Sequence, residues 1–505
     1  MRALVSAAEM RAAEEEAGRR GLTPAALMQL AGRGAADWLL HQPKGKERRY
    51  LVLAGPGNNG GDALVVAGLL AKAGAAVQIV TYRRAQPSPV DPSGVPRFDS
   101  ADDPSLERLR AALLGCDIVV DGLLGTGKAR PIESDLATML GEVRSAPKHP
   151  SIVALDVPTG VDVDSGAADP HALPARHTLT FGYEKRGLRF SPARELAGEV
   201  LLVDIGLPNT PIVPVVACLP EGSDVAGWLP VRSPTTHKYT AGAVLALAGS
   251  PLYAGAPVLC TTAVLRAGAG YVTLAVREAS RAAMAALLIE PTMLVVPDAP
   301  RTAVAHIREA AGRYQALLIG PGLGREPDTV FLVRSLLSEP LSGPRAAVVD
   351  ADGLFALSQA PNWWEQAPLP LVLTPHTGEM ARLTGLSGAD IERNRLEVAA
   401  TWTKTWGQVL VLKGAPTIVA APTGELTINP TGNPLLATAG TGDVLSGIIA
   451  AFLAGGCAPF NAARAAVYLH GLAADLAVET YGERGMLAGD LLSLIPQAIK
   501  VVLAS

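Results

Sequence analysis

Cysteine is scarce in this 505-residue chain, and aromatic residues make up only 4% of it. The cysteines lie far apart in mostly apolar surroundings, without a CxxC pair or a spacing typical of metal ligands. Neither a disulfide framework nor a zinc-thiolate site is therefore indicated, and we expect a reduced, cytoplasmic setting. The four cysteines are Cys116, Cys218, Cys260 and Cys457.

Long runs of charge of one sign are also absent, and the formal net charge is only −4. Such a balance favours neither nucleic acid nor an acidic membrane surface as a partner. The first 20 residues carry acidic side chains where an export signal needs an apolar core. Two uncharged stretches, 239–265 and 444–463, are interrupted by Gly, Pro or Ser, so we interpret them as buried segments rather than membrane spans.

Short apolar runs that end in glycine-rich turns and lead into helical patterns recur along the chain. Such alternation is typical of parallel sheets covered on both faces, so each half is predicted to be an α/β domain, the first a Rossmann-like one with three layers. Residues 205–234 are rich in proline, so we expect domains at 1–210 and 230–505 with a linker at 211–229. The predicted strands are 50–54, 77–82, 117–120 and 151–155, then 243–248, 271–276, 316–319, 346–349, 371–373 and 409–412.

Two glycine motifs in the first half match nucleotide-binding signatures only in part. Residues 55–60 satisfy G-x-G-x-x-G, but the next strand ends in Arg83 and Arg84 rather than in the acid that holds a ribose. An NADP-type Rossmann site stays open as an alternative. Residues 122–129 match G-x4-G-K, yet Ala129 stands where a P-loop needs a hydroxyl for Mg²⁺, so ATPase chemistry is not favoured there.

Three carboxylates follow predicted strands of the first half. Asp62, Asp121 and Asp156 stand at or just beyond the carboxyl ends of these strands, where open α/β sheets bind ligands. Capping of the following helices would explain any one of them. Several carboxylate and amide oxygens in one place would also suit a hard cation.

The stretch TAGTGDVLSG at 438–447 combines a glycine turn, a carboxylate and the start of an apolar helix. Backbone N–H groups of Gly440, Thr441 and Gly442 can point at a phosphate, as at other helix N-termini. Asp443 follows at once and can take a proton from a hydroxyl. This pattern predicts phosphoryl transfer to an alcohol, with helix capping as the plainer alternative.

Other loops of the second half add polar and small residues after predicted strands. Small residues at 249–256 and 320–324 let a backbone approach a ligand closely, although tight packing would use them equally. His376 lies in a loop after a strand, with Glu379 nearby, and we expect it to contact a ligand. Lys413 stands at another strand end, where a cation can meet phosphate, although it could also be a solvated surface lysine.

The motifs of the first half resemble those of the NAD(P)H-hydrate epimerase family across residues 1 to about 208. They are GPGNNGGD, DGLLGTG, LDVPTGVD, TFGYEKRG and DIGLP. The resemblance implies that Asp156 transfers a proton and that a potassium ion is held by Asn59, Asp121 and Thr159. The residues implied to line the site of the hydrated nucleotide are Asn58, Asn59, Gly60, Gly61, Asp62, Gly125, Thr126, Gly127, Lys128, Ala129, Arg130, Pro131 and Asp156.

The second half, from about 230 to 500, resembles the ribokinase-like superfamily and, within it, the ADP-dependent NAD(P)H-hydrate dehydratase branch. The resemblance is carried by HK, GPGLG, TPHTGE, KG and TGNPLLATAGTGDVLSG. It implies Asp443 as the catalytic base and Mg²⁺ with ADP as the phosphoryl donor. The implied substrate contacts are Ala256, Gly324, His376 and Asp443, and the implied nucleotide contacts are Lys413, Gly414, Ala415, Pro416, Thr417, Asn433, Gly440, Thr441 and Gly442.

Five positions depart from the usual residues of these families. Ala63 replaces a common glycine, Thr159 a usual serine, Thr377 a proline and Ala439 a glycine, and none of these changes removes a reacting group. Gln29 replaces a usual glutamate and loses a charge, which affects the contacts of its predicted helix.

Both resemblances imply one substrate, a nicotinamide ring hydrated at C6. We therefore expect a two-domain repair enzyme that epimerises the R and S hydrates of NADH and NADPH, then dehydrates the S form. Its expected partners are these hydrates and ADP, with neither nucleic acid nor membrane, and we expect a homo-oligomer. The alternative is a kinase of a small alcohol or vitamin precursor, with a non-catalytic N-terminal binding domain.

Overall fold

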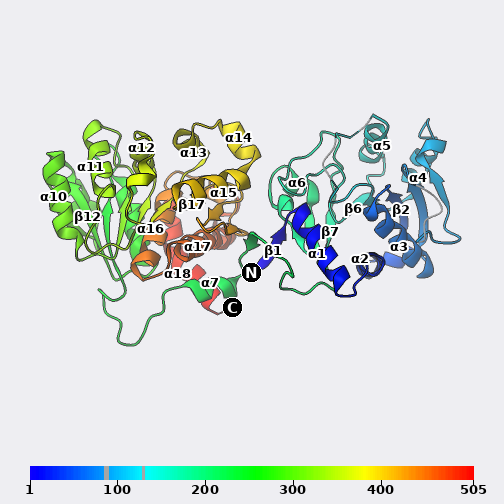
Figure 1. Cartoon of the computed structure of the whole chain (residues 1–505), viewed down its shortest axis with the longest axis horizontal. Helices are drawn as coiled ribbons and strands as arrows, with labels where there is room; N and C mark the ends of the chain where they lie inside the picture. The colour runs from blue at the N-terminus through cyan, green and yellow to red at the C-terminus, as the bar shows by residue number, and fades with distance from the viewer. Residues whose placement is uncertain (85–89, 128–130, 133, 505) are drawn as a thin grey trace. The chain divides into compact units, whose positions relative to one another are not determined.

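The computed structural model describes residues 1–84, 90–127, 131–132 and 134–504. The chain divides into two compact units, Ala3–Ala217 on one side and Cys218–Ser505 together with Met1–Arg2 on the other. In each unit a sheet lies between layers of helices (Figure 1). Both units are thus α/β folds built largely on parallel strands, as the alternating pattern predicts.

The N-terminal unit contains one strictly parallel sheet of seven strands, in the order β4-β3-β2-β5-β6-β7-β9. The helices and strands of this part of the chain are β1 Arg2–Val5, α1 Ala7–Arg19, α2 Pro24–His41, η1 Gly45–Glu47, β2 Arg49–Ala54, α3 Asn58–Lys72, β3 Ala76–Thr81, β4 Arg97–Asp99, η2 Ser100–Asp102, α4 Glu107–Gly115, β5 Ile118–Gly122, α5 Ser134–Arg144, β6 Ser151–Leu155, β7 His177–Phe181, β8 Glu184–Lys185, η3 Arg186–Arg189, α6 Ala193–Ala197 and β9 Glu199–Val203.

Alternate residues of its central strands fill two separate hydrophobic cores. Tyr50 and Val52 of β2 pack with α1, α2 and α3, while Leu51 and Leu53 pack with α4 and α5 on the other face. The chain enters the sheet at β2, extends to one side through β3 and β4, and then continues from β5 to the other. The point between β2 and β5 is therefore a topological switch, where open α/β sheets bind ligands.

The C-terminal unit has the strand order β13-β12-β11-β14-β15-β16-β17-β18-β19, parallel up to β17 and antiparallel beyond. The remaining helices and strands are β10 Ala217–Leu219, α7 Gly222–Trp228, β11 Ala243–Leu247, α8 Gly255–Arg266, β12 Tyr271–Arg277, α9 Glu278–Leu287, β13 Thr292–Val296, α10 Pro300–Ala311, β14 Ala316–Ile319, α11 Pro327–Leu337, β15 Ala346–Val349, α12 Asp352–Ser358, η4 Trp363–Gln366, β16 Leu371–Leu373, α13 Thr377–Thr384, α14 Gly388–Arg393, α15 Arg395–Trp406, β17 Val409–Leu412, β18 Ile418–Ala420, β19 Leu426–Ile428, η5 Pro434–Leu436, α16 Thr441–Ala454, α17 Pro459–Tyr481 and α18 Ala488–Leu503.

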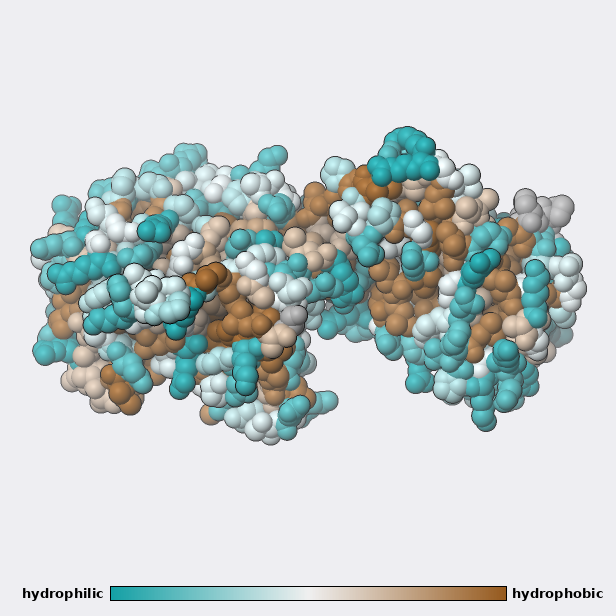
Figure 2. All heavy atoms as spheres, turned by 90° about the horizontal axis from the view of Figure 1, so that it is seen from below, coloured by the Kyte–Doolittle hydropathy of each residue, from teal (hydrophilic) through white to brown (hydrophobic). Residues whose placement is uncertain are grey.

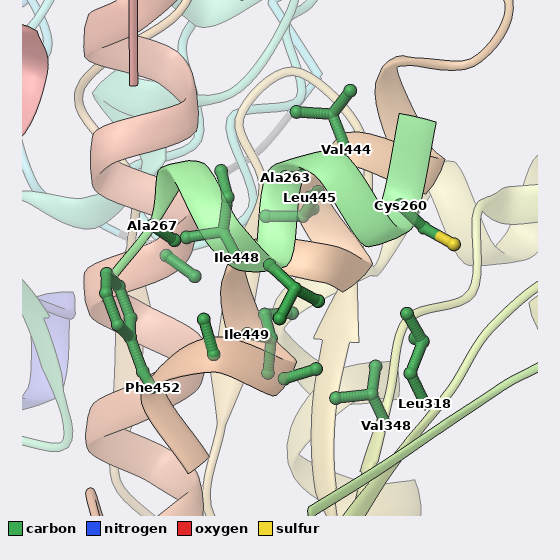
Figure 3. Close-up of a cluster of buried hydrophobic side chains, with 14 of the residues drawn as sticks. Cys260, Ala263, Ala267, Leu318, Val348, Val444, Leu445, Ile448, Ile449 and Phe452 are labelled. Atoms are coloured by element: carbon green, nitrogen blue, oxygen red, sulfur yellow. The ribbon is translucent and has the colours of Figure 1, made fainter. Parts of the chain in front are cut away.

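Helix α16 is the central helix of this unit, and every residue from Val444 to Ala454 is buried. Its side chains pack against α8 and against strands β14 and β15 (Figure 3). Gly447 allows the close approach, because a Cβ at this position would lie 2.8 Å from the Cβ of Ala263. A second topological switch lies between β11 and β14. From β11 the chain extends the sheet to one side through β12 and β13, and from β14 it continues on the other side.

Two short elements lie inside the segment expected to be a linker. Strand β10 and helix α7 occupy 217–219 and 222–228, and the boundary between the two units falls at 217/218. The start of α7 is stabilised by reciprocal capping between Glu221 and Asp224, and its Val225 is fully buried. The sequence does not reveal this helix, because its seven residues form only about two turns and offer little periodicity to detect among the prolines.

The surface of the C-terminal unit includes apolar side chains, visible as brown areas in Figure 2. Val478 of α17, Val501 and Leu503 of α18, and Leu487 directly before α18 are exposed. Across the described part of the chain, no helix combines the length and apolar character that crossing a membrane requires.

Candidate active sites

The first candidate site lies at the switch point of the N-terminal sheet. Helix α3 begins with Asn58 directly after β2, and the loop from Gly122 follows β5. These backbones run close together, because a Cβ on Gly125 would lie 3.0 Å from the Cβ of Asn59. Of the predicted site residues, Lys128, Ala129 and Arg130 lie outside the described residues.

One hydrogen-bond network joins Asn59, Asp121 and Thr159, which come from three different loops. Asn59 Nδ2 donates to the carbonyl oxygens of Leu124 and Leu155 at 2.9 and 3.0 Å. Thr159 Oγ1 donates to Asp121 Oδ1 at 2.7 Å, and the Thr159 amide donates to Asp121 Oδ2 at 2.9 Å. The same Thr159 hydroxyl accepts from the Leu124 amide at 3.1 Å. The structure thus brings the three predicted cation ligands together.

The charge and polarity of this network fit a cation. Asp121 is fully enclosed, and burial raises the pKa of its carboxyl group despite hydrogen bonds from Thr159 and Leu123 that lower it. Asn59 Oδ1 is buried without a hydrogen-bond partner. Among the described residues, no three His, Cys, Asp or Glu side chains form a group that could hold a metal. Any cation here therefore needs amide, hydroxyl and backbone oxygens as well.

A second group of charges lies beside this network. Asp62 is buried, and its pKa is well above the usual value because of burial first, then the neighbouring carboxylates of Asp156 and Glu14. Asp156 follows β6 with a positive φ of 64°, a conformation that aspartate adopts more readily than most residues. Its carboxylate forms an ion pair with Lys185 of β8, which is completely buried.

Arg83 and Arg84, which follow β3, form their contacts with other residues of the protein. Arg84 Nη1 donates to the carbonyl oxygens of Gly55 and Gly57 at 2.7 and 2.9 Å, and Arg83 pairs with Asp135. Arg84 thus stabilises the loop after β2, which explains its position without a nucleotide 2′-phosphate.

The second candidate site is a pocket of about 500 Å³ at the switch point of the C-terminal sheet. It includes three of the four predicted substrate contacts, Ala256, Gly324 and Asp443. The residues that line it are Leu252, Tyr253, Ala256, Gly322, Gly324, Arg325, Glu326, Asp352 and Asp443.

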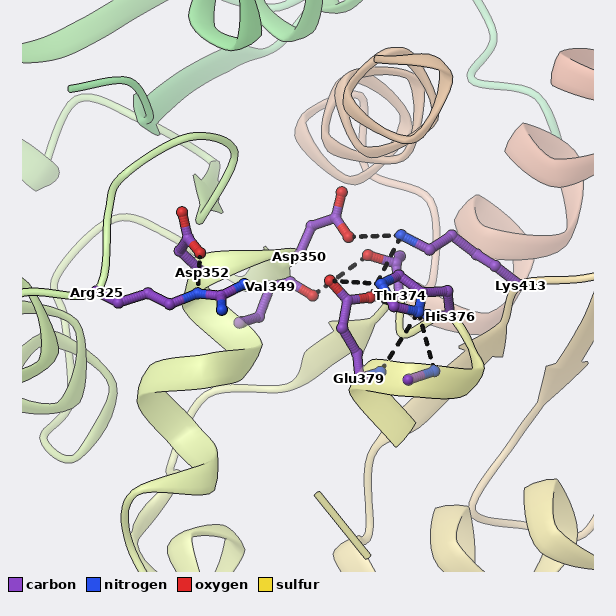
Figure 4. Close-up of polar contacts among 9 residues, drawn as sticks. Arg325, Val349, Asp350, Asp352, Thr374, His376, Glu379 and Lys413 are labelled. Atoms are coloured by element: carbon purple, nitrogen blue, oxygen red, sulfur yellow. Dashed lines mark hydrogen bonds and ion pairs between the residues drawn. The ribbon is translucent and has the colours of Figure 1, made fainter. Parts of the chain in front are cut away.

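Carboxylates and one lysine gather at the strand ends beside this pocket (Figure 4). Lys413 Nζ donates to Asp350 Oδ1 at 2.9 Å and lies 3.7 Å from Glu379 Oε2. Burial lowers the pKa of Lys413, but Asp350 and Glu379 outweigh it, and the pKa is raised. Asp352 accepts from the Gly324 amide at 3.0 Å and from Arg325 Nε at 2.8 Å. These contacts fix the loop that carries Gly324.

Asp443 stands in the first turn of α16, where its carboxyl group has a pKa of about 7. Burial is the main cause, and Asp350, Asp352 and Glu379 add to it while Lys413 opposes them. Gly440 is the N-cap of α16 and no side chain caps the helix. Asp443 is therefore not a capping residue, and a pKa near 7 suits a general base.

The turn before Asp443 presents backbone amides to the side of Lys413. Gly440 has φ 93°, which favours glycine, and a Cβ on Gly442 would lie 3.4 Å from Lys413 Nζ. No described residue accepts a hydrogen bond from the Gly442 amide. The Thr441 carbonyl is 2.9 Å from Nε2 of His470, whose pKa burial lowers to about 4, so that a neutral imidazole supports the turn. The geometry can accommodate a phosphate between the amides and the ammonium group.

The loop after β17, which carries the predicted nucleotide contacts 413–417, is held from behind by Arg395. This buried guanidinium donates to the carbonyl oxygens of Leu412, Lys413 and Pro416 at 3.1, 3.0 and 3.2 Å. Asn433 is also engaged within the protein, since its Nδ2 donates to Ala474 O at 2.8 Å. Arg395 was missed because nothing in its helical context relates it to a loop 18 residues away.

His376 has a structural contact that its sequence context does not reveal. Its Nδ1 accepts from the amides of Gly378 and Glu379 at 3.0 and 3.4 Å, so the side chain caps helix α13. The imidazole is 59% exposed and does not line the pocket. Its Nε2 is left facing outward, 3.6 Å from Glu379 Oε1.

Besides Arg395, sequence reasoning missed Asp350 and Lys185, which the fold places in these sites. Asp350 directly follows β15, so the rule used for Asp121 and Asp156 could have found it. Lys185 belongs to a motif quoted for its family resemblance, but its contact with Asp156 spans 29 residues and depends on tertiary structure.

Comparisons with known proteins agree with the two-unit arrangement. Residues 24–187 match the family described as YjeF-related protein N-terminus, and residues 244–497 match the family described as NAD(P)H-hydrate dehydratase. A ribokinase-like superfamily protein from Enterococcus faecalis shares the fold of the C-terminal unit, with a TM-score of 0.50 and 26% identity over 58% of this chain and 99% of its own.

Two full-length relatives are described as bifunctional NAD(P)H-hydrate repair enzymes. The one from Moorella thermoacetica is 39% identical, covering 98% of this chain and 96% of its own length. The one from Salinibacter ruber is 38% identical, covering 94% and 92%. These matches extend over both units and favour the repair interpretation over a small-alcohol kinase with an inert N-terminal domain. The chain belongs to the family of bifunctional NAD(P)H-hydrate repair enzymes.

Proposed function

We propose that this protein repairs hydrated NADH and NADPH by epimerising the R and S hydrates at its N-terminal site and dehydrating the S hydrate at its C-terminal site. The observation that carries the proposal is Asp443, a carboxylate that lines the pocket and has a pKa of about 7, directly after a Gly442 amide that no described residue accepts from. The family membership supplies the substrate, and this geometry supplies the means to activate its hydroxyl group.

At the C-terminal site, Asp443 accepts the proton of the C6 hydroxyl as that oxygen attacks the terminal phosphoryl group. The amides of residues 440–442 stabilise the negative charge of the transferring group. Loss of phosphate and of a ring proton then regenerates the dihydronicotinamide. A hydroxyl near a base is a far better nucleophile than a free one, because the proton leaves as the new bond forms.

We further propose ADP as the donor, bound by Lys413–Thr417 and Asn433 and by the turn at 440–442, with His376 contacting the hydrate. Asp350 and Glu379 carry more negative charge than Lys413 neutralises, so they fit Mg²⁺ shared with the nucleotide phosphates. The ion would supply charge neutralisation of the phosphates when bound.

At the N-terminal site, we propose that residues 58–62, 125–131 and Asp156 surround the hydrate and that Asn59, Asp121 and Thr159 hold K⁺. The orphan oxygen of Asn59 and the buried charge of Asp121 support this assignment. The ion would supply positive charge that fixes the three loops. Asp156 is the proposed proton-transfer group of this site.

Two further proposals concern the whole chain. We propose a homo-oligomer, because α17 and α18 expose apolar side chains, and contact with a second copy would remove these side chains from water. Light scattering on the purified protein tests this, and a monomer at micromolar concentration would contradict it. All four cysteines are unpaired, which supports a cytoplasmic, reducing location.

The proposed function is tested by recovery of NADH absorbance from a mixture of R and S hydrates. We expect complete recovery with ADP and Mg²⁺, and consumption of the S form alone when the N-terminal site is inactivated by Asp156→Asn. ATP in place of ADP tests the donor. Accumulation of a phosphorylated hydrate without NADH would instead show a kinase that lacks the elimination step.

A further inference from the structure

The buried ion pair of the N-terminal site has an asymmetric arrangement of hydrogen bonds. Oδ1 of Asp156 accepts from the Phe181 amide at 3.2 Å, from Thr180 Oγ1 at 3.5 Å and from Lys185 Nζ. No described residue donates to Oδ2 of the same carboxylate. One oxygen is therefore saturated by the protein, and the other is left for a ligand.

Lys185 is held as firmly as the carboxylate that it contacts. Its ammonium group also donates to the carbonyl oxygen of Phe181 at 2.8 Å, and its side chain is 1% exposed. Strand β8 keeps it in place, because Val5 of β1 pairs with Lys185 in a parallel ladder. The Asp156 side chain keeps 12% of its surface exposed, so the pair is closed on the lysine side and open on the carboxylate side.

Other charged groups surround the pair. Helix α1 contributes Glu14, which interacts electrostatically with both Asp156 and Lys185 and is also influenced by Arg11. Helix α3 contributes Asp62, which interacts with the same pair and with Arg84. Three carboxylates thus face one buried ammonium ion. Burial, followed by Asp156, raises the pKa of Glu14, while Lys185 opposes this.

We propose that Lys185 is a positioning residue of the epimerase site, whose buried ammonium ion fixes Oδ1 of Asp156 and thereby directs Oδ2 at the C6 hydroxyl of the hydrate. This inference rests on the proposed epimerase function and deepens it. As the hydroxyl proton moves to Oδ2, C6 becomes a carbonyl carbon and its bond to the ring nitrogen N1 breaks, with N1 taking a proton from water. Re-closure on the other face of the carbonyl forms the C6–N1 bond again, releases the N1 proton to water and returns the proton of Oδ2 to the oxygen, so that C6 is inverted. Lys185 itself touches no substrate.

A charged lysine is needed here because two neighbouring carboxylates favour the protonated form of Asp156, and only its ionised form can accept a proton from the hydrate. The ammonium ion stabilises the ionised carboxylate, whereas Glu14 and Asp62 favour the protonated one. Removing the positive charge should therefore raise the pH at which Asp156 becomes an effective base. A role in packing alone would not shift a pH profile.

The test uses the full-length protein with Lys185→Met, which keeps the length of the side chain and removes its charge. Epimerisation of the R hydrate should fall about 10-fold or more at pH 7, with KM changed less than about twofold. The acid limb of kcat/KM should move to higher pH by about one unit or more, so that activity partly returns in alkaline buffer. Thermal unfolding of the variant followed by circular dichroism reports whether the N-terminal unit is folded, because the dehydratase site lies in the other unit.

Lys148→Met is the matched control, because this lysine is exposed and precedes β6, at the end of the strand opposite to the one that leads into Asp156. It should retain the wild-type rate and pH profile. If Lys185→Met retains them as well, Lys185 has no positioning role and the inference is overturned. If the wild-type protein itself does not exceed the spontaneous rate of R-to-S conversion, the proposed epimerase function fails instead.

A double variant keeps the inference testable should Lys185→Met fail to fold. Asp156→Asn, Lys185→Met removes the charges of both members of the buried ion pair, and a residue that acts only through Asp156 then has nothing left to position. The double variant should therefore bind the R hydrate as tightly as Asp156→Asn alone. A further loss of affinity of about 10-fold would mean that Lys185 contacts the hydrate directly, which contradicts the inference.

Discussion

At the scale of single residues, burial among like charges raises the pKa of one carboxyl group in each candidate site, Asp62 and Asp443. Asp443 is the clearest case, since its neighbours Asp350, Asp352 and Glu379 outweigh one lysine. The sequence could predict Asp443 itself, because it follows a glycine turn that opens an apolar helix. It could not predict the raised pKa, because Asp350 and Glu379 reach Asp443 only through the folding of separate strands.

Replacing Asp443 by Asn should leave the shape of the site intact while removing its proton acceptor. Dehydration of the S hydrate should then fall by roughly 10²- to 10⁴-fold, as expected for loss of a general base. NADH formation from purified S hydrate measures this. R-to-S conversion and nucleotide binding serve as internal controls, and both should stay close to wild type. A variant that unfolds yet keeps its activity per folded molecule would show that Asp443 is only structural.

The raised pKa of Asp443 also predicts how stability depends on pH. The folded protein binds this proton more tightly than the unfolded chain, whose carboxyl group titrates near the usual value of 3.8, so this group costs stability as pH rises from there through about 7. Asp443→Asn removes the cost. In ligand-free protein the variant should unfold at a higher temperature than wild type at pH 8, and the two should converge only near pH 4. Equal destabilisation at both pH values would contradict this origin of the shift.

At the scale of elements, each site is built from loops at the carboxyl ends of parallel strands. Periodicity located most of these strands, and the rule for strand ends then located Asp121 and Asp156. Helix α7 was not predicted, because it is short and lies among prolines. The capping role of His376 was also hidden, since it depends on where α13 begins.

The three-loop network of the N-terminal site predicts a response to potassium. Asp121→Ala should weaken epimerisation and its activation by K⁺, because the variant loses the buried charge that would hold the ion. Thr159→Ser is the matched control, since it keeps the hydroxyl that bonds to Asp121. Rates of R-hydrate consumption at limiting K⁺ distinguish the two. Unchanged epimerase activity in Asp121→Ala would rule out this site, and S-hydrate repair should be nearly intact in both variants.

Helices α16 and α8 lie so close together that we expect an added methyl group at Gly447 to be poorly tolerated. In Gly447→Ala the new Cβ would lie 2.8 Å from Ala263 Cβ and also press on the Cys260 backbone, so the helices must separate. We expect a loss of about 1–3 kcal/mol in the free energy of unfolding, measured with urea. Gly489→Ala in α18 meets nothing within 4 Å and should be neutral or slightly stabilising. Equal effects of the two changes would show that the helices are not in close contact.

At the scale of the whole molecule, the chain consists of two units that each have their own sheet and cores. Sequence composition suggested this division, because strands recur on both sides of a proline-rich segment. Fragments separated near residue 215 should therefore fold independently, each with one activity. Circular dichroism and separate assays of epimerisation and dehydration check this. Aggregation or loss of turnover of the C-terminal fragment would show that the units depend on each other.

The burial of α16 restricts where the C-terminal site can move. From Val444 to Ala454 the helix has no exposed residue, and it has no charged side chain after Asp443. It cannot shift without exposing the core of its unit, so the amides at its start form a rigid platform. If the hydrate binds in this pocket as proposed, closure over it falls to the other lining residues, among which Leu252 is 82% exposed and Tyr253 54%. Substrate release would then depend on movement of the loop that carries these two residues, while Asp443 stays fixed at the start of α16.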